Sequence, residues 1–201
     1  MKKLAFILLA IFTSLYSFSQ ESTFPSSQIG ISYLGLGDND AVHLTSLDGA
    51  ASYSGRGYYG MQIDYFRSLN KVLTLETGIG FRHHEFTIHP NTMPQVDDTG
   101  REFYSSLLVI PVGMRVNFLK YAFVNAGALV TYSLSHQEEI SDQNGIGFNI
   151  GLGIKYDFQS GVGVYVNPFM AMHSAISFAK ENYPERITEG GLKIGFTYKL
   201  H

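Results

Sequence analysis

Residues 103–135 read FYSSLLVIPVGMRVNFLKYAFVNAGALVTYSLS, and apolar side chains alternate there with polar or small ones over two successive runs. In the first run one parity is apolar, with Leu108, Ile110, Val112, Met114, Val116 and Phe118. The opposite parity carries Pro111, Gly113, Arg115 and Asn117. After Leu119 and Lys120 the second run repeats the pattern, with Ala122, Val124, Ala126, Ala128, Val130 and Tyr132 on one face. A period of two residues predicts β-strands, and about 9–11 residues suffice for a tilted strand to cross a bilayer.

Six further segments show the same alternation. They are Gln28–Leu36, Tyr58–Arg67, Leu73–Arg82, Phe148–Asp157, Val162–His173 and Leu192–Leu200. With the hairpin they make eight strands, whose connections alternate between long and short. The long ones are Gly37–Gly57, His84–Glu102, His136–Gly145 and Ser177–Glu189. Outer-membrane barrels combine short periplasmic turns with longer extracellular loops, so the sequence predicts an all-β fold, an eight-stranded antiparallel up-and-down transmembrane β-barrel.

Composition narrows the classes of function. A length of 201 residues is that of one domain, and a mean hydropathy of +0.03 argues against a bundle of apolar helices. The net charge of -3 comes without basic blocks, which argues against a nucleic-acid partner. The chain has no cysteine, so thiol catalysis and cysteine metal sites are excluded.

The first residues have the pattern of a signal peptide. Lys2 and Lys3 precede an apolar run, Leu4–Phe12, and Ser17 and Ser19 are the small residues of a cleavage site after Ser19. The apolar run is shorter than the ~18 residues of a membrane-spanning helix. We therefore expect a signal peptide at 1–19, a barrel domain at 20–201, and a location in the cell outer membrane.

Charged residues fall on the parity opposite the apolar face. They are Asp64, Glu76, Arg82, Arg115, Lys155 and Lys193. We expect them to form a polar network in the lumen, because buried charges persist only when they are paired and hydrogen-bonded. Aromatic residues near strand ends suggest an interfacial girdle. They are Tyr58, Tyr59, Phe103, Tyr104, Phe118, Tyr121, Tyr156 and Phe158.

Three segments carry a family resemblance: LLVIPVGMRVNF, YAFVNAGALVTY and GFNIGLGIKYDF. With Ile110-Pro111, Tyr121, Ala126-Gly127 and Gly151-Leu152-Gly153, they resemble the outer-membrane β-barrel domain family of small porin-like proteins in Gram-negative bacteria. This resemblance extends over the whole chain after the signal peptide and implies fold and location more than activity.

The last strand also resembles the signal read by the barrel-assembly machinery. A polar residue, a glycine and two hydrophobic or aromatic residues fill it: Lys193, Gly195, Tyr198 and Leu200. It departs from the usual pattern in that His201, rather than an aromatic residue, follows Leu200. The resemblance implies that outer-membrane lipids and the assembly machinery are partners of this chain, which we expect to be a monomer.

Two groups of residues suggest site chemistry. His83, His84 and His89 surround Glu85, but zinc sites need three or four converging ligands and no fourth partner is evident. We interpret this group as the polar base of a loop.

The second group suggests a lipid A modifying enzyme and comprises His173, Ser174, Ser177 and Glu181. Side chains two residues apart share a strand face, so Ser174 is expected to point away from His173. The lipid A 3-O-deacylases that this segment would resemble place Ser two residues after His, and Ala175 stands there instead.

The sequence thus favours a non-enzymatic integral outer-membrane protein without a cofactor, with a structural or binding role carried by extracellular loops. Three alternatives stay open: a narrow porin-like channel, a lipid A modifying enzyme, and an exported soluble ligand-binding barrel. The channel is disfavoured because side chains fill the interior of an eight-stranded barrel.

Overall fold

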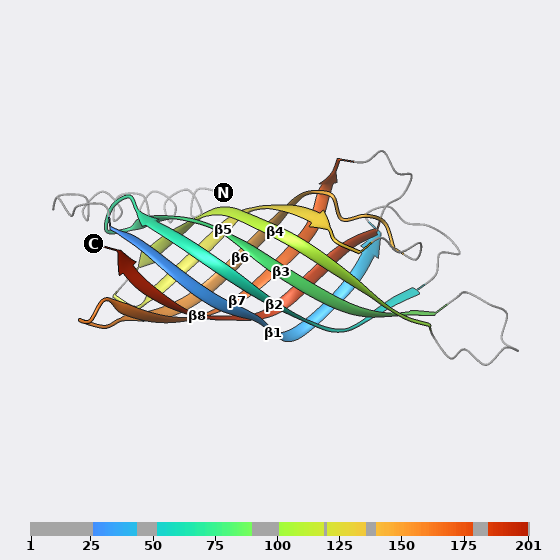
Figure 1. The fold of residues 1–201 in the computed structure, drawn as a ribbon, viewed down its shortest axis with the longest axis horizontal. Helices are drawn as coiled ribbons and strands as arrows, with labels where there is room; N and C mark the ends of the chain where they lie inside the picture. Colours follow the sequence, from blue (N-terminus) through green and yellow to red (C-terminus); the bar gives the residue numbers. More distant parts are fainter. Residues whose placement is uncertain are drawn as a thin grey trace, which may run out of the picture.

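Eight antiparallel strands form the computed structural model, which describes residues 26–43, 52–89, 101–118, 120–135, 140–178 and 185–200. The strands are β1 Ser27–His43, β2 Ser52–Ser68, β3 Leu73–His89, β4 Arg101–Phe118, β5 Ala122–Ser133, β6 Gly145–Asp157, β7 Val162–Ser177 and β8 Glu185–Leu200. Each strand pairs with the next in sequence, and β8 pairs with β1 to close the barrel (Figure 1). The predicted fold is confirmed. The predicted signal peptide lies outside the described residues.

Short turns join β2 to β3, β4 to β5 and β6 to β7 at one end of the barrel, where β1 begins and β8 ends (Figure 1). We call this the turn end and the opposite end the loop end. Within the described part of the chain, no helix is long and apolar enough to cross a membrane.

Several strands extend farther toward the loop end than the alternation predicts. Residues 37–43 and 52–57, predicted as loop, belong to β1 and β2, and β3 continues through His84 to His89. Likewise, β8 begins at Glu185 inside the predicted loop Ser177–Glu189. The apolar alternation weakens here, whereas backbone pairing continues, as between Asn39 and Glu189. A period-two apolar pattern marks only the part of a strand that has an apolar side.

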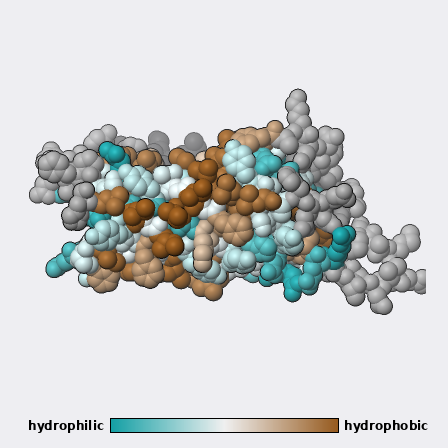
Figure 2. Space-filling view, viewed as in Figure 1, coloured by the Kyte–Doolittle hydropathy of each residue, from teal (hydrophilic) through white to brown (hydrophobic). Residues whose placement is uncertain are grey.

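Large apolar side chains cover the outside of the barrel. Met61 is 63% exposed and Phe196 60% exposed, and other exposed residues of this belt are Ile31, Ile79, Val112, Ile150, Leu152, Ile154 and Met170. Figure 2 shows hydrophobic residues gathered over the middle of the barrel, with hydrophilic ones toward the ends. An outward apolar band between polar ends is the lipid-facing surface of a transmembrane barrel.

The aromatic girdle was predicted correctly only in part. Tyr58 and Phe103 are buried in the lumen, so placing them in the girdle was wrong. The other six are exposed on the outer surface: Tyr59, Tyr104, Phe118, Tyr121, Tyr156 and Phe158. Near the turn end Tyr121 stacks on Tyr156, with ring centroids 5.8 Å apart. Proximity to a strand end does not set the facing of a ring, because parity decides it.

Gly153 on β6 makes room for a lumen side chain. A Cβ atom at this position would lie 2.3 Å from Cζ of Phe123 and 2.7 Å from the carbonyl oxygen of Val166. Phe123 is fully buried, and the Arg115 guanidinium lies over its ring at 3.8 Å. The absence of a side chain at Gly153 therefore allows a large ring to pack against the sheet.

Gly153→Val is expected to destabilise the barrel by about 1–3 kcal/mol, because the added atoms overpack the lumen. The measurement is the temperature at which the compact, unboiled band converts to the unfolded band on a denaturing gel. Leu152→Val, on the outward face of the same strand, is the matched control and should leave that temperature nearly unchanged. An equal effect of both variants would contradict the packing argument.

Candidate functional site

Buried Arg115 and partly buried Glu76 form an ion pair near the turn end of the lumen. The guanidinium of Arg115 also lies over the ring of Phe66, at 4.6 Å, as well as that of Phe123. Asn125 donates a hydrogen bond of 3.1 Å from Nδ2 to Glu76 Oε2. Both charges therefore have partners, and aromatic faces stabilise the cation.

Asp64 is the centre of a second network. Its carboxylate, 1% exposed, accepts hydrogen bonds from Lys193 Nζ at 2.7 Å, Ser32 Oγ at 2.6 Å and Tyr165 OH at 2.9 Å. Gln62 Nε2 donates to the same carboxylate. Four donors on one carboxylate are the kind of compensation that a buried charge requires.

Gln62 connects this network to Arg82 and Glu189. Arg82 donates from Nη2 to Gln62 Oε1 at 2.8 Å, and its Nε lies 3.5 Å from Glu189 Oε1. A continuous chain of polar contacts therefore runs from Lys193 toward the loop end. Lys155 is separate, since it pairs with Asp157 at 3.5 Å and is partly exposed.

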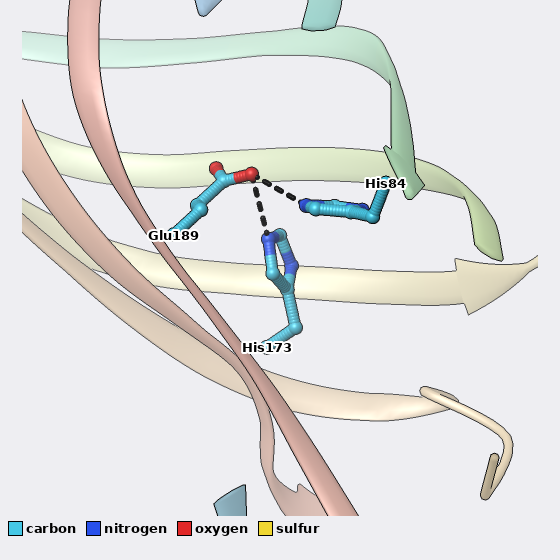
Figure 3. A group of neighbouring side chains, drawn as sticks. All are labelled: His84, His173 and Glu189. Carbon is cyan, nitrogen blue, oxygen red and sulfur yellow. Dashed lines mark hydrogen bonds and ion pairs between the residues drawn. The ribbon is translucent and has the colours of Figure 1, made fainter. Parts of the chain in front are cut away.

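Glu189 contacts two histidines from distant parts of the chain (Figure 3). His84 Nε2 lies 2.8 Å from Glu189 Oε2, and His173 Nε2 lies 3.4 Å from the same oxygen. All three side chains are buried, and they come from β3, β7 and β8. The prediction that His84 lies at the base of a loop was wrong, as was the placement of Glu189 in a loop. Both residues lie within strands and face the lumen.

A bulge in β7 orients His173 and Ser174. The pairing of β6 with β7 shifts between Ile146 and Phe148, and Ser174 has a positive φ of 47°. Residues 173–175 of β7 stand opposite Gly147 alone, and these two extra residues locally break the alternation of side chains, so His173 and Ser174 are both fully buried. The expectation that Ser174 points away from His173 was therefore wrong.

The bulge does not bring Ser174 into contact with a base among the described residues. Ser174 Oγ has no hydrogen-bond partner among the described residues, whereas an activated nucleophile needs a base within hydrogen-bond reach. Ser177 lies at the end of β7, where its Oγ is 3.5 Å from the carbonyl oxygen of Asn144, and Glu181 lies outside the described residues. These four residues do not form a described triad.

His83 and Glu85, from the same histidine group, lie on the outer face of β3. His83 Nδ1 is 2.9 Å from Ser106 Oγ, and its ring lies 5.2 Å from that of Tyr59 and 5.4 Å from that of Tyr104. Glu85 is exposed on the same face of β3. Because side chains alternate along β3, His83 and Glu85 point outward whereas His84 points into the lumen. The side chain of His89 is not among those that the structure describes.

The lumen offers little free space. A cavity of about 40 Å³ is lined by Asp64, Glu76, Arg82, Glu189 and Lys193, among others. This volume holds a few water molecules at about 10–15 Å³ each. This cavity by itself is too small for a larger solute.

An apolar plug fills the loop end of the lumen. Its buried residues include Leu34, Phe86, Phe103, Leu107, Val109, Leu129, Ile140 and Ile187. The connection between β5 and β6 completes it, because Gln143 Nε2 donates to the Glu185 carbonyl oxygen at 2.9 Å and Gln143 Oε1 accepts from Ile187 N at 3.1 Å. These hydrogen bonds hold residues 140–144 against β8 at the loop end of the barrel.

The four residues that resemble the assembly signal lie on both faces of β8. Lys193 faces the lumen and Gly195 is covered by the ring of Tyr165, since an added Cβ would lie 2.5 Å from that ring. Tyr198 and Leu200 are exposed on the outer face near the turn end.

Replacing only one residue of the Arg115–Glu76 ion pair is expected to lower the free energy of unfolding more than replacing both residues. Glu76→Leu leaves a buried guanidinium without its carboxylate, a change that costs about 3–5 kcal/mol. In the double variant Glu76→Leu/Arg115→Met no charge is left unpaired, so its free energy of unfolding should lie above that of Glu76→Leu alone. Urea titration of the refolded barrel in lipid vesicles measures both. A double variant less stable than Glu76→Leu would contradict this account.

Comparisons with known proteins support the fold. No protein-family model matches the chain, and no curated protein sequence matches it. Among solved structures, the outer membrane protein OprG from Pseudomonas aeruginosa is similar, with a TM-score of 0.55, 11% identity, and coverage of 91% of this chain and 99% of OprG. The outer membrane protein AlkL, determined in lipid bilayers, has a TM-score of 0.50, 13% identity, and coverage of 90% and 94%. With its apolar outer belt, the chain has the fold of an integral outer-membrane β-barrel protein.

Proposed function

We propose that this chain is a non-enzymatic outer-membrane protein with a closed lumen, and that it acts through binding at its loop end. The filled lumen is the observation that carries the proposal. Paired charges occupy its middle and turn end, and the apolar plug occupies its loop end. A barrel filled in this way presents only its outer surface and its rims to other molecules.

The strands extend beyond the membrane on the loop side. A strand such as β1 has 17 residues. At about 3.3 Å per residue and a tilt of about 40°, it rises about 43 Å along the barrel axis, against an apolar band about 25 Å tall. The turns are short, so most of the excess of about 18 Å lies at the loop end.

Toward the loop end, the outward-facing side chains change from aromatic to charged. Tyr59, His83 and Tyr104 form an aromatic cluster on the outer surface, and an exposed ion pair between Arg56 and Glu102 lies closer to the loop end. Aromatic rings prefer the membrane interface, and charges prefer the water beyond it. The loops are therefore mounted on a rigid rim of paired strands above the bilayer, an arrangement suited to binding.

Burial of His173 and Ser174 supports the non-enzymatic part of the proposal. Both side chains lie inside the barrel with no exposed surface, where the acyl chain of a lipid has no access. We also propose that residues 1–19 are removed as a signal peptide. We propose further that the barrel-assembly machinery recognises the last strand and that the assembled barrel is a monomer.

Reconstituted in a planar lipid bilayer, the purified barrel is expected to give no steady single-channel conductance. The physical reason is that the charges of the lumen are paired across it and the plug closes its loop end. A general porin reconstituted in the same way is the positive control. Regular, reproducible conductance steps from this chain would establish the channel instead.

Replacing residues 44–51 and 90–100 by Gly-Ser linkers is expected to abolish function while the barrel still assembles. Cells that lack the protein would be complemented with the wild type, this loop variant or the outward-facing control Leu152→Val. Assembly is checked by the compact band that unboiled membranes give on a denaturing gel. Function is checked by whether the variant restores the wild-type phenotype to the deletion strain. Full recovery with the loop variant would overturn the assignment of function to the loops.

A further inference from the structure

We infer that His84, His173 and Glu189 bind one divalent transition-metal ion, Zn²⁺ or a cation of similar ligand preference, inside the barrel. One ligand atom from each residue can be chosen so that the three lie within 4.8 Å of one another. Within the described residues this is the one group of three histidine, cysteine or carboxylate side chains that converges so closely. Figure 3 shows both imidazoles directed at the same carboxylate oxygen.

The distances from the two histidines to Glu189 Oε2 are close to those between neighbouring ligands of a coordination sphere. Zinc binds imidazole nitrogen and carboxylate oxygen at about 2.0–2.2 Å, so neighbouring ligand atoms of a tetrahedral site lie about 3.3–3.4 Å apart. His173 Nε2 is 3.4 Å from Glu189 Oε2, which matches that spacing. His84 Nε2, at 2.8 Å from the same oxygen, has to move away by about half an ångström, which a small rotation of the side chain supplies.

The donor set favours zinc and its neighbours among the first-row metals. Two imidazole nitrogens and one carboxylate oxygen suit Zn²⁺, Co²⁺, Ni²⁺ and Cu²⁺, whereas Mg²⁺ and Ca²⁺ prefer oxygen ligands alone. Among the described residues, His173 Nδ1 is buried without a hydrogen-bond partner, and Nε2 has only the 3.4 Å contact with Glu189. Buried polar atoms without a well-formed hydrogen bond are rare in folded proteins, and ligation of a metal would give Nε2 a stronger partner than its 3.4 Å contact with Glu189.

The surroundings set limits on the charge that the site accepts. Arg82 Nε lies 3.5 Å from the other oxygen of Glu189 and repels a bound cation. The ring of Tyr58 stacks on His84 at 5.5 Å, and its buried hydroxyl has no hydrogen-bond partner in the described part of the chain. Three protein ligands leave one tetrahedral position for a water or hydroxide, and a hydroxide would offset part of the charge.

The metal would join strands that are far apart in sequence. His84 belongs to β3, whereas His173 and Glu189 belong to β7 and β8 on the other side of the lumen. A metal that binds only the folded state stabilises it. We therefore assign the ion a structural role, to hold these strands together near the loop end.

The test uses the full barrel, produced without a histidine tag and refolded in detergent. Titration with ZnCl₂ is followed by calorimetry, and CoCl₂ is used as a probe because tetrahedral Co²⁺ absorbs visible light. We expect one ion per barrel and an upward shift of several degrees in the temperature at which the compact band is lost. Because the site is buried, each metal is added both before and after refolding. The absence of saturable binding in both protocols would overturn the inference.

Variants separate this site from adventitious binding. His173→Ala and Glu189→Gln should each weaken Zn²⁺ binding at least tenfold and remove the thermal shift. His83→Ala is the matched control, because His83 is adjacent to His84 in sequence but lies on the outer face. Binding that survives in His173→Ala, or that is lost in His83→Ala, would show that the ion binds elsewhere. The wild-type stoichiometry decides the question even if a lumen variant fails to fold.

Discussion

Backbone pairing between β1 and β8 is the constraint on which the rest of the structure depends. Hydrocarbon offers no water to hydrogen-bond an unpaired strand edge, so a sheet in a membrane has to close on itself. The ladder from Ser27 opposite Leu200 to His43 opposite Glu185 provides this closure. Closure with eight strands encloses a space only as wide as the side chains that fill it. Every inward position is therefore a packing position, and every inward charge needs a partner.

The lumen meets this demand differently along its length. In its middle and turn end, Asp64 and Glu76 each bind a cation and further hydrogen-bond donors. Toward the loop end, stacked rings such as Phe86 and Phe103, with centroids 5.1 Å apart, replace the charges. Glu189 lies where the two regions meet, bound to Arg82 on one side and to the histidines on the other. In the polar region each side chain has to keep its position for the next one to keep its hydrogen bonds, because the groups form one network.

Much of this arrangement could be predicted from the sequence, because parity along a strand is a local property. The inward facing of Arg115 follows from the alternation around it, and so does that of Asp64. The strand ends could not be predicted in this way, since the apolar pattern fades while the backbone ladder continues. Glu189 shares the parity of Lys193, so extending the alternation of β8 toward the loop end was the signal that could have found it.

The contact of Glu189 with His84 cannot be predicted from the sequence around either residue. The two residues are 105 positions apart and meet because β3 and β8 face each other across the closed lumen. The bulge at Ser174 is equally hidden, because a positive φ at a serine contradicts the preference of that residue. Such features depend on the register of the whole barrel, which no single segment determines.

The position of the histidine layer is consistent with a mechanical role. His84 pairs with Tyr58 across the β2–β3 ladder, and the adjacent residues His83 and Tyr59 belong to the outer aromatic cluster at the proposed membrane interface. Below this level lipid surrounds the barrel, and water does not compete for its backbone hydrogen bonds. Above it water surrounds the outer faces of the strands, while their inner faces pack against the apolar plug, and the rim that carries the loops depends on these contacts across the lumen. The contacts of Glu189 with His84 and His173 lie at this transition, where a cross-lumen link limits separation of the strands that support the loops.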